Sequence, residues 1–178
     1  MSLPRRTRAT LLTLVTGLAA ALPLAAPGAA HAEQIPSPKP YHVEFRNLAT
    51  GKCLEVADQR TDDGAPVRQW SCHGGLSQRW RTWGDGILVN EYSRKCLDVP
   101  GFSTVWGTRP VQWTCSGVRQ NNQEWTTPGV NAPSPGFLSS LGLVLDVAGY
   151  DPSDGATVTL WGANGGANQL WTATVTQG

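Results

Sequence analysis

The sequence predicts an all-β domain in which three similar repeats close into a compact barrel with pseudo-threefold symmetry. Three observations support this fold class. A segment with leucine, an acidic residue and valine occurs three times, each time followed by a glycine turn and a tryptophan. Alternating apolar residues between turn glycines are typical of short strands. No segment beyond residue 32 shows the periodicity of about 3.6 residues that marks an amphipathic helix.

The first 32 residues have the features of a secretory signal peptide. Residues 1–8 carry three arginines and no acid, residues 9–26 are mostly apolar or small, and residues 30–32 read Ala-His-Ala. A membrane anchor is the alternative, but Pro23 and Pro27 interrupt the apolar stretch. We therefore expect cleavage after this motif and a secreted, extracellular product that does not insert into the membrane.

The charge and the spacing of polar residues argue against several kinds of partner. Three of the fourteen basic residues lie in the leader and all thirteen acids lie after it, so the processed chain is slightly acidic. Nucleic-acid binding depends on clustered positive charge, so we expect no nucleic-acid partner. Histidines and cysteines do not have metal-ligand spacing, so we expect no metal and no cofactor. We also expect a monomer.

The three repeats share fixed spacings. In every copy the acid lies nine residues before the turn glycine and fifteen before a tryptophan, and a Gln-x-Trp motif ends ten or twelve residues later. A β-propeller also uses repeated four-stranded units, but propellers need about four to eight blades. Three copies must close differently. After a proline-rich arm at residues 33–40, we place the repeats at about 41–85, 86–130 and 131–178.

Each repeat is predicted to contain several short strands. Leucine and valine on either side of the acid predict the first of these strands. The Asp-Gly or Trp-Gly pair that follows predicts a hairpin turn, because glycine adopts positive φ without penalty. The valine and tryptophan after the turn predict the return strand, and the Gln-x-Trp segment predicts another.

The cysteines follow the same register. Cys53 and Cys72 are nineteen residues apart, and so are Cys96 and Cys115. Four cysteines allow three connectivities. In the third repeat, apolar residues replace both equivalent positions together, as expected if the two positions touch. We therefore predict the disulfides Cys53–Cys72 and Cys96–Cys115, which suit an exported protein.

The three Gln-x-Trp motifs, preceded by Cys-Leu-Glu-Val, Cys-Leu-Asp-Val and Val-Leu-Asp-Val, resemble the ricin B-type lectin domain. The resemblance covers residues 41–178. It implies a β-trefoil of twelve strands, four per repeat, with a six-stranded barrel capped by three hairpins. It also implies a carbohydrate-binding module whose partners are glycans or polysaccharides.

The resemblance implies up to three sugar sites, one per repeat. A sugar ring needs an aromatic platform beside a carboxylate and an amide. In the family these are the acid, the tryptophan after the turn, and the residue before Gln-x-Trp. The first repeat departs from this pattern with glutamate and serine. The candidates are Asp146, Trp161, Asn164, Asn168 and Gln169; then Asp98, Trp113, Asn122 and Gln123; then Glu55, Trp70, His73 and Gln78.

The remaining tryptophans are expected to have other roles. Those of the Gln-x-Trp motifs should lie in the core, with their glutamines as supports for the site. Trp106 takes the place of the turn aspartate in the second repeat. We hypothesise that it extends the second site, with packing against Phe102 as the alternative. Trp83 is assigned to the core or to a lid.

The sequence favours a binding protein over an enzyme. It contains no nucleophile elbow and no phosphate-binding glycine loop. Its acids recur with the repeat, which indicates three similar sites instead of one acid–base pair. We expect weak sites that act together on glycans containing galactose, xylose or arabinose. The alternative is a trefoil with decayed sugar sites that serves as a protein-interaction or inhibitor module.

Overall fold

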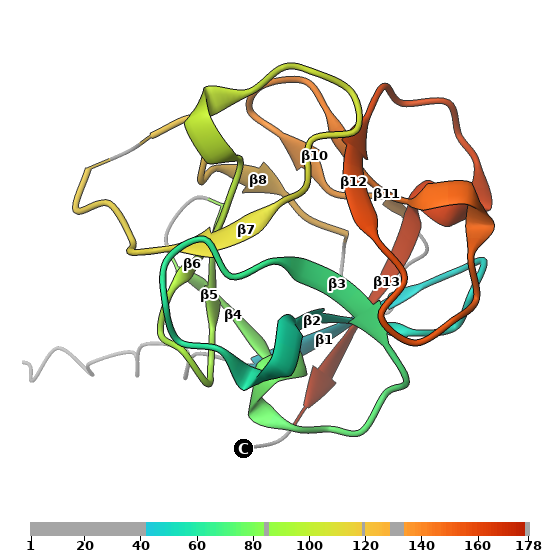
Figure 1. Cartoon of the computed structure of the whole chain (residues 1–178), viewed down its shortest axis with the longest axis horizontal. Helices are drawn as coiled ribbons and strands as arrows, with labels where there is room; N and C mark the ends of the chain where they lie inside the picture. Colours follow the sequence, from blue (N-terminus) through green and yellow to red (C-terminus); the bar gives the residue numbers. More distant parts are fainter. Residues whose placement is uncertain (1–41, 84–85, 119, 129–133, 177–178) are drawn as a thin grey trace, which may run out of the picture. The chain divides into compact units, whose positions relative to one another are not determined.

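The computed structural model describes residues 42–83, 86–118, 120–128 and 134–176. The expected signal peptide at 1–32, the proline-rich arm at 33–40 and the Trp83 side chain lie outside the described part. Within these ranges the regular secondary structure is β-strands and five single-turn 3-10 helices, joined by loops. Figure 1 shows how the strands are arranged. No helix in these ranges is long and apolar enough to cross a membrane.

The strands follow the three repeats. The first repeat holds β1 (His42–Asn47), β2 (Cys53–Val56), β3 (Val67–Trp70) and β4 (Trp80–Trp83). The second holds β5 (Ile87–Asn90), β6 (Cys96–Asp98), β7 (Val111–Trp113) and β8 (Trp125–Thr126). The third holds β9 (Ser134–Pro135), β10 (Leu138–Ser139), β11 (Val144–Val147), β12 (Val158–Trp161) and β13 (Leu170–Thr176).

The third repeat divides its first strand into β9 and β10. Between them, Gly136 lies so close to the chain that a Cβ there would be 2.0 Å from the Gln169 carbonyl oxygen. Phe137 follows and is fully buried. The two short strands pair with different neighbours, β9 with β13 and β10 with β8 and β11. The chain therefore has the predicted twelve strand positions, one of them interrupted.

Pairing between repeats closes the barrel. The last strand of each repeat runs antiparallel to the first strand of the next: β4 with β5, β8 with β10, and β13 with β1. The β1–β13 ladder joins the first repeat to the third (Figure 1). The two middle strands of each repeat form a hairpin: β2–β3, β6–β7 and β11–β12. This arrangement confirms the predicted β-trefoil.

The tryptophans of the three Gln-x-Trp motifs lie in the core, as predicted, and are at most 3% exposed. Each indole N–H donates to the carbonyl of the leucine before the acid of its own repeat. The donor–acceptor pairs are Trp80–Leu54 at 3.1 Å, Trp125–Leu97 at 3.0 Å and Trp171–Leu145 at 3.2 Å. These bonds satisfy the indole that burial would otherwise leave unpaired, and they fix the acid strand against the core.

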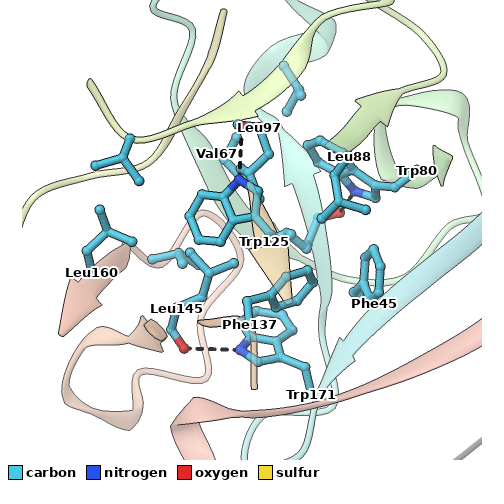
Figure 2. Close-up of a cluster of buried hydrophobic side chains, with 14 of the residues drawn as sticks. Phe45, Val67, Trp80, Leu88, Leu97, Trp125, Phe137, Leu145, Leu160 and Trp171 are labelled. Atoms are coloured by element: carbon cyan, nitrogen blue, oxygen red, sulfur yellow. Dashed lines mark hydrogen bonds between the residues drawn. The ribbon is translucent and has the colours of Figure 1, made fainter. Parts of the chain in front are cut away.

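Phe137 lies among the rings that come from different repeats (Figure 2). Its centroid is 4.5 Å from that of Phe45, 5.9 Å from Trp171 and 6.5 Å from Trp125, with edge-to-face geometry in each pair. Such aromatic pairs contribute about 0.5–1.5 kcal/mol each beyond area burial. The repeats therefore share one core instead of three separate ones.

Both predicted disulfides are confirmed. Cys53 bonds to Cys72, and Cys96 bonds to Cys115. Each joins the start of an acid-bearing strand to the second residue after the tryptophan that ends the return strand of the same hairpin. For loops of this size the chain-entropy treatment gives about 3 kcal/mol of stabilisation each. The disulfides thus hold the two halves of the first and second candidate sites together.

Candidate functional site

The register of each hairpin places the acid and the tryptophan that ends the return strand on one face; this tryptophan is exposed in the second and third hairpins and half-buried in the first. In the first hairpin, Cys53 pairs with Trp70 and Glu55 pairs with Arg68. Side chains two apart on a strand share a face, so Glu55 and Trp70 are diagonal neighbours. The second and third hairpins repeat this register at Asp98–Val111 and Asp146–Thr159.

The glutamine of each Gln-x-Trp motif braces the acid. Its Nε2 donates to the carboxylate over 2.8–3.0 Å in the pairs Gln78–Glu55, Gln123–Asp98 and Gln169–Asp146. The same Nε2 donates to the carbonyl of the residue after the tryptophan that ends the return strand. Its Oε1 accepts a backbone N–H two residues further on. One buried amide therefore fixes both the acid and the loop that carries the tryptophan.

The second repeat forms an open cavity of about 580 Å³. Asp98 lies in its wall with 3% exposure, and Trp113 is 47% exposed beside it. Asn122 donates to Oδ2 of Asp98 at 2.9 Å, as does Gln123 at 2.8 Å, and no described residue bonds to Oδ1. The buried Oδ1 of Asn122 also has no partner in the described part of the chain. Of these two acceptors, Asp98 Oδ1 is the one left for a ligand beside the exposed ring, because Asn122 Oδ1 is buried.

The third repeat has a smaller cavity of about 300 Å³ between Asp146, Thr159 and Trp161. Gln169 bonds to Oδ2 of Asp146, and Oδ1 has no bonded partner among the described residues. Asn168 turns its Nδ2 to the Val147 carbonyl at 3.0 Å, which leaves its buried Oδ1 unpaired.

Asn164 is less well placed for this third site than its neighbours. Its Oδ1 accepts the Gly166 N–H at 2.8 Å, and it does not line the described cavity. Asp146 and Trp161 are therefore the two predicted residues that the structure brings together at the cavity wall.

The first repeat differs because its carboxylate is fully engaged. Arg68 donates to Oε1 of Glu55 from Nη2 at 3.1 Å and from Nε at 3.2 Å. Gln78 donates to Oε2 at 3.0 Å, and Nε2 of His73 lies 3.1 Å from the same oxygen. The Arg68 guanidinium lies 4.3 Å from the centre of the Trp70 ring.

His73 faces Glu55 in a defined orientation. Its Nδ1 accepts the Gly75 N–H at 3.0 Å, so in the neutral ring the proton is on Nε2. Nε2 then donates to Glu55. The predicted residues Glu55, Trp70, His73 and Gln78 are all brought together, but the bonds they make are to one another and to Arg68.

The family model of the ricin-type β-trefoil lectin domain matches residues 41–171. The chain belongs to this family. Nigrin b from Sambucus nigra is 28% identical over 119 residues, which cover 61% of this chain and 20% of Nigrin b.

Two solved structures are also similar to this lectin domain. The designed threefold-symmetric protein ThreeFoil is 35% identical with a TM-score of 0.67, over 76% of this chain and 99% of that one. The exo-β-1,3-galactanase 1,3Gal43A from Clostridium thermocellum is 30% identical with a TM-score of 0.70, over 78% of this chain and 31% of that one. The lectin domain thus spans a fifth of Nigrin b and less than a third of the galactanase.

Burial raises the pKa of two acids in this lectin domain. Desolvation is the main cause for both Asp98 and Asp146, since removal from water disfavours the charged form. The amide of the neighbouring glutamine opposes the shift in each case, because it stabilises the carboxylate. Both sites therefore hold a carboxylate that takes up a proton at a higher pH than an ordinary aspartate.

The hairpin tip of each repeat contacts the next repeat of the lectin domain. Asp63 accepts the Thr114 N–H at 2.6 Å and pairs with Lys95 at 2.7 Å. Asp154 forms the same pair of contacts, with Ser71 and Lys52. Each tip thus supports the strand end that carries the hairpin tryptophan of the following repeat.

Trp106 replaces this polar contact at the third interface. Its ring centroid is 5.1 Å from that of Trp161, and the planes are inclined by 39°. It also fills the space over Gly162, where a Cβ would come within 2.6 Å of the indole. The expectation that Trp106 extends the second site is therefore wrong, because a tip reaches the next repeat and not its own hairpin. The observed ring partner is also not Phe102.

The sequence reasoning missed Arg68 as a member of the first site. It also missed Asp58 and Tyr92, which line the same cavity of about 430 Å³. The available signal was the hairpin register, which pairs position 68 directly with the acid. Within the described ranges, no cluster of three or more His, Cys, Asp or Glu residues is arranged to hold a metal ion.

Proposed function

We propose that this lectin domain binds carbohydrate through its second and third repeats, and that it acts as a secreted, non-enzymatic module on glycans containing galactose, xylose or arabinose. One observation carries the proposal. In both repeats a buried aspartate is braced through Oδ2, and its Oδ1, beside an exposed tryptophan, bonds to none of the described residues.

This arrangement matches the chemistry of a sugar. The apolar C–H face of a pyranose packs on an indole ring, and its hydroxyl hydrogens bond to carboxylate oxygens. A charged acceptor strengthens such hydrogen bonds. The Oδ1 atoms of Asn122 and Asn168 are buried, so the carboxylates of Asp98 and Asp146 are the acceptors that this proposal assigns to sugar hydroxyls. The hydroxyl whose position matches these acceptors would determine the preferred sugar.

The sites are shallow, so each should bind weakly. Two sites on one rigid domain raise the effective concentration of the second binding event on a polymer, and avidity can exceed single-site affinity by about 10²–10⁴. A polysaccharide or a glycan-bearing surface is therefore a better target than a free monosaccharide. The two disulfides are compatible with an extracellular location.

The second candidate function is a protein-interaction or inhibitor module. It is favoured by the first repeat, in which Arg68 and His73 take up the carboxylate that a sugar would use. Under this alternative, all three sites would have lost sugar binding and the trefoil surface would recognise a protein.

A glycan array and affinity gels with immobilised polysaccharide separate these functions. Asp98→Asn and Asp146→Asn keep the shape of the side chain and remove its charge. We expect each to weaken retention and the double variant to abolish it. Trp113→Ala and Trp161→Ala should act in the same direction. The matched controls are Asp151→Asn and Leu48→Ala, which change exposed side chains outside the cavities.

The outcomes distinguish three functions. Retention that depends on the two aspartates supports the lectin. Retention unchanged in the double variant contradicts the proposed sites, and failure to bind any glycan supports the protein-interaction module. Release of reducing ends from the polysaccharide would indicate an enzyme.

A further inference from the structure

The three repeats provide an internal comparison at the residue opposite the acid. That residue is Arg68 across from Glu55, Val111 across from Asp98, and Thr159 across from Asp146. Valine and threonine are short, and in their repeats the carboxylate keeps a free oxygen. Arginine is long enough to reach along the hairpin face to both the acid and the tryptophan. The first site also differs from the others in Glu55 and in the contact of His73 with its carboxylate, but position 68 is where a cation reaches both the acid and the tryptophan.

Arg68 occupies the two features that a sugar would use. Its Nε and Nη2 take up Oε1 of Glu55, and its guanidinium lies against the Trp70 face at 4.3 Å. Nη2 also bonds to Asp58 at 2.9 Å. The side chain is 21% exposed and Glu55 is 5% exposed, so this pair is largely shielded from water. The guanidinium thus lies where the plane of a pyranose and its hydroxyls would be.

A neutral sugar is a poor competitor for this position. Hydrogen bonds between ions are roughly twice as strong as those between neutral groups, and a planar guanidinium also stacks favourably on an aromatic face. Arg68 belongs to the chain, so it gives up no translational freedom when it binds, whereas a sugar does. Displacing it would also leave two carboxylates without their cation.

The charge of the cluster does not favour an acidic sugar either. Glu55 and Asp58 supply two carboxylates against one guanidinium, and the Nδ1 of His73 is used as an acceptor. An anionic ligand would approach an excess of negative charge. The first repeat thus keeps a cavity of about 430 Å³, but a neutral sugar there must compete with Arg68 and an anionic sugar meets excess negative charge.

We propose that Arg68 is an internal occupant of the first site and limits this lectin domain to two open sugar sites. The inference rests on the proposed function, because it assigns the number of sites that bind. It follows that removing the Arg68 side chain creates a third sugar site from residues already in place. Glu55 would keep its bonds to Gln78 and His73, so the acid stays oriented.

The test uses the indole N–H signals of the hairpin tryptophans in a two-dimensional NMR titration with galactose, xylose and arabinose. In the natural protein we expect the Trp113 and Trp161 signals to shift and the Trp70 signal to remain unchanged. In Arg68→Thr and in Arg68→Val, which copy the third and second repeats, we expect the Trp70 signal to shift by an amount comparable to the other two.

The controls separate a local opening from a general disturbance. Arg60→Thr removes an exposed arginine that lines none of the described cavities. In this variant the Trp70 signal should not shift when sugar is added. The signals of the buried Trp80 and Trp171 should not move in any variant, which shows that the fold is kept.

Two results would overturn the inference. A Trp70 shift in the natural protein as large as those of Trp113 and Trp161 would show that the first site is already open. If the Trp70 signal does not shift in either Arg68 variant while the Trp113 and Trp161 signals do, Arg68 is not what prevents sugar binding at the first site. The proposed function would be unaffected by that result. If none of the three signals shifts with any sugar, both the proposed function and this inference would be wrong.

Discussion

Asp98 and Asp146 are buried, and the sugar-binding role that we propose for them requires their charge. Burial raises the pKa of both side chains, so the charged form is less stable in the folded protein than in the unfolded chain. Their ionisation therefore lowers folding stability, and this penalty disappears as the pH falls below the raised pKa. Sugar binding has the opposite requirement, because the carboxylate is the acceptor. Keeping these two carboxylates charged and buried therefore lowers the free energy of unfolding.

Binding through Asp98 and Asp146 should depend on pH. We expect retention on immobilised glycan to decline on acidification, beginning at a higher pH than the titration of an ordinary aspartate. The tip aspartates Asp63 and Asp154 have a lowered pKa because Lys95 and Lys52 bond to them, so the contacts between repeats persist in this window.

Affinity electrophoresis over a pH series, with folding followed by tryptophan fluorescence, measures this decline. Retention that stays constant well below the ordinary aspartate pKa would count against carboxylate acceptors.

At the scale of elements, the hairpin is the unit that builds a site and the hairpin tip is the unit that connects neighbours. Sequence spacing predicted the acid and the tryptophan of each hairpin and the disulfides of the first two, because all of these depend on register within one repeat. It misplaced Trp106, because which repeat a tip touches depends on how the three hairpins are arranged around the axis. Arg68 was missed for a related reason: its role depends on which residue faces it across the hairpin.

Trp106 forms a contact between the second and third repeats. At the third interface Leu143 and Gly162 stand where the other repeats have lysine and serine or threonine. An apolar contact thus replaces the ionic one. We expect Trp106→Ala to destabilise the fold by about 0.5–1.5 kcal/mol, the usual contribution of an aromatic pair. It should also weaken binding at the third site, because Trp161 loses its support.

Denaturant unfolding of Trp106→Ala beside Val105→Ala, a neighbour that is also exposed, checks the stability change. Equal stability of the two variants would show that the Trp106–Trp161 contact does not hold the interface.

At the scale of the whole molecule, the threefold pattern explains both what could be predicted and what could not. The three Gln-x-Trp tryptophans are buried and bond to three leucine carbonyls. Because this motif recurs at the same place in each repeat, the fold could be predicted from the sequence. Departures from symmetry were harder to foresee. The break at Gly136 arises from a close approach to Gln169, a residue far along the chain. Closure of the barrel through β1 and β13 likewise joins the two ends of the trefoil.

The same symmetry determines how the domain would act. Two open sites on one rigid body favour repeated glycans over single sugars, since linked binding events reinforce one another. The first repeat, with its carboxylate engaged by Arg68, would contribute to stability instead of binding. Function in this lectin domain would therefore depend on how the three copies differ as much as on what they share.

A crystal structure of the domain soaked with galactose, xylose or arabinose tests the central claim most directly. We predict a pyranose or furanose ring stacked on Trp113 and on Trp161, with a hydroxyl within hydrogen-bond distance of Oδ1 of Asp98 and of Asp146. We predict no sugar over Trp70. Sugar bound away from both aspartates, or empty second and third sites at saturating concentrations of all three sugars, would contradict this claim.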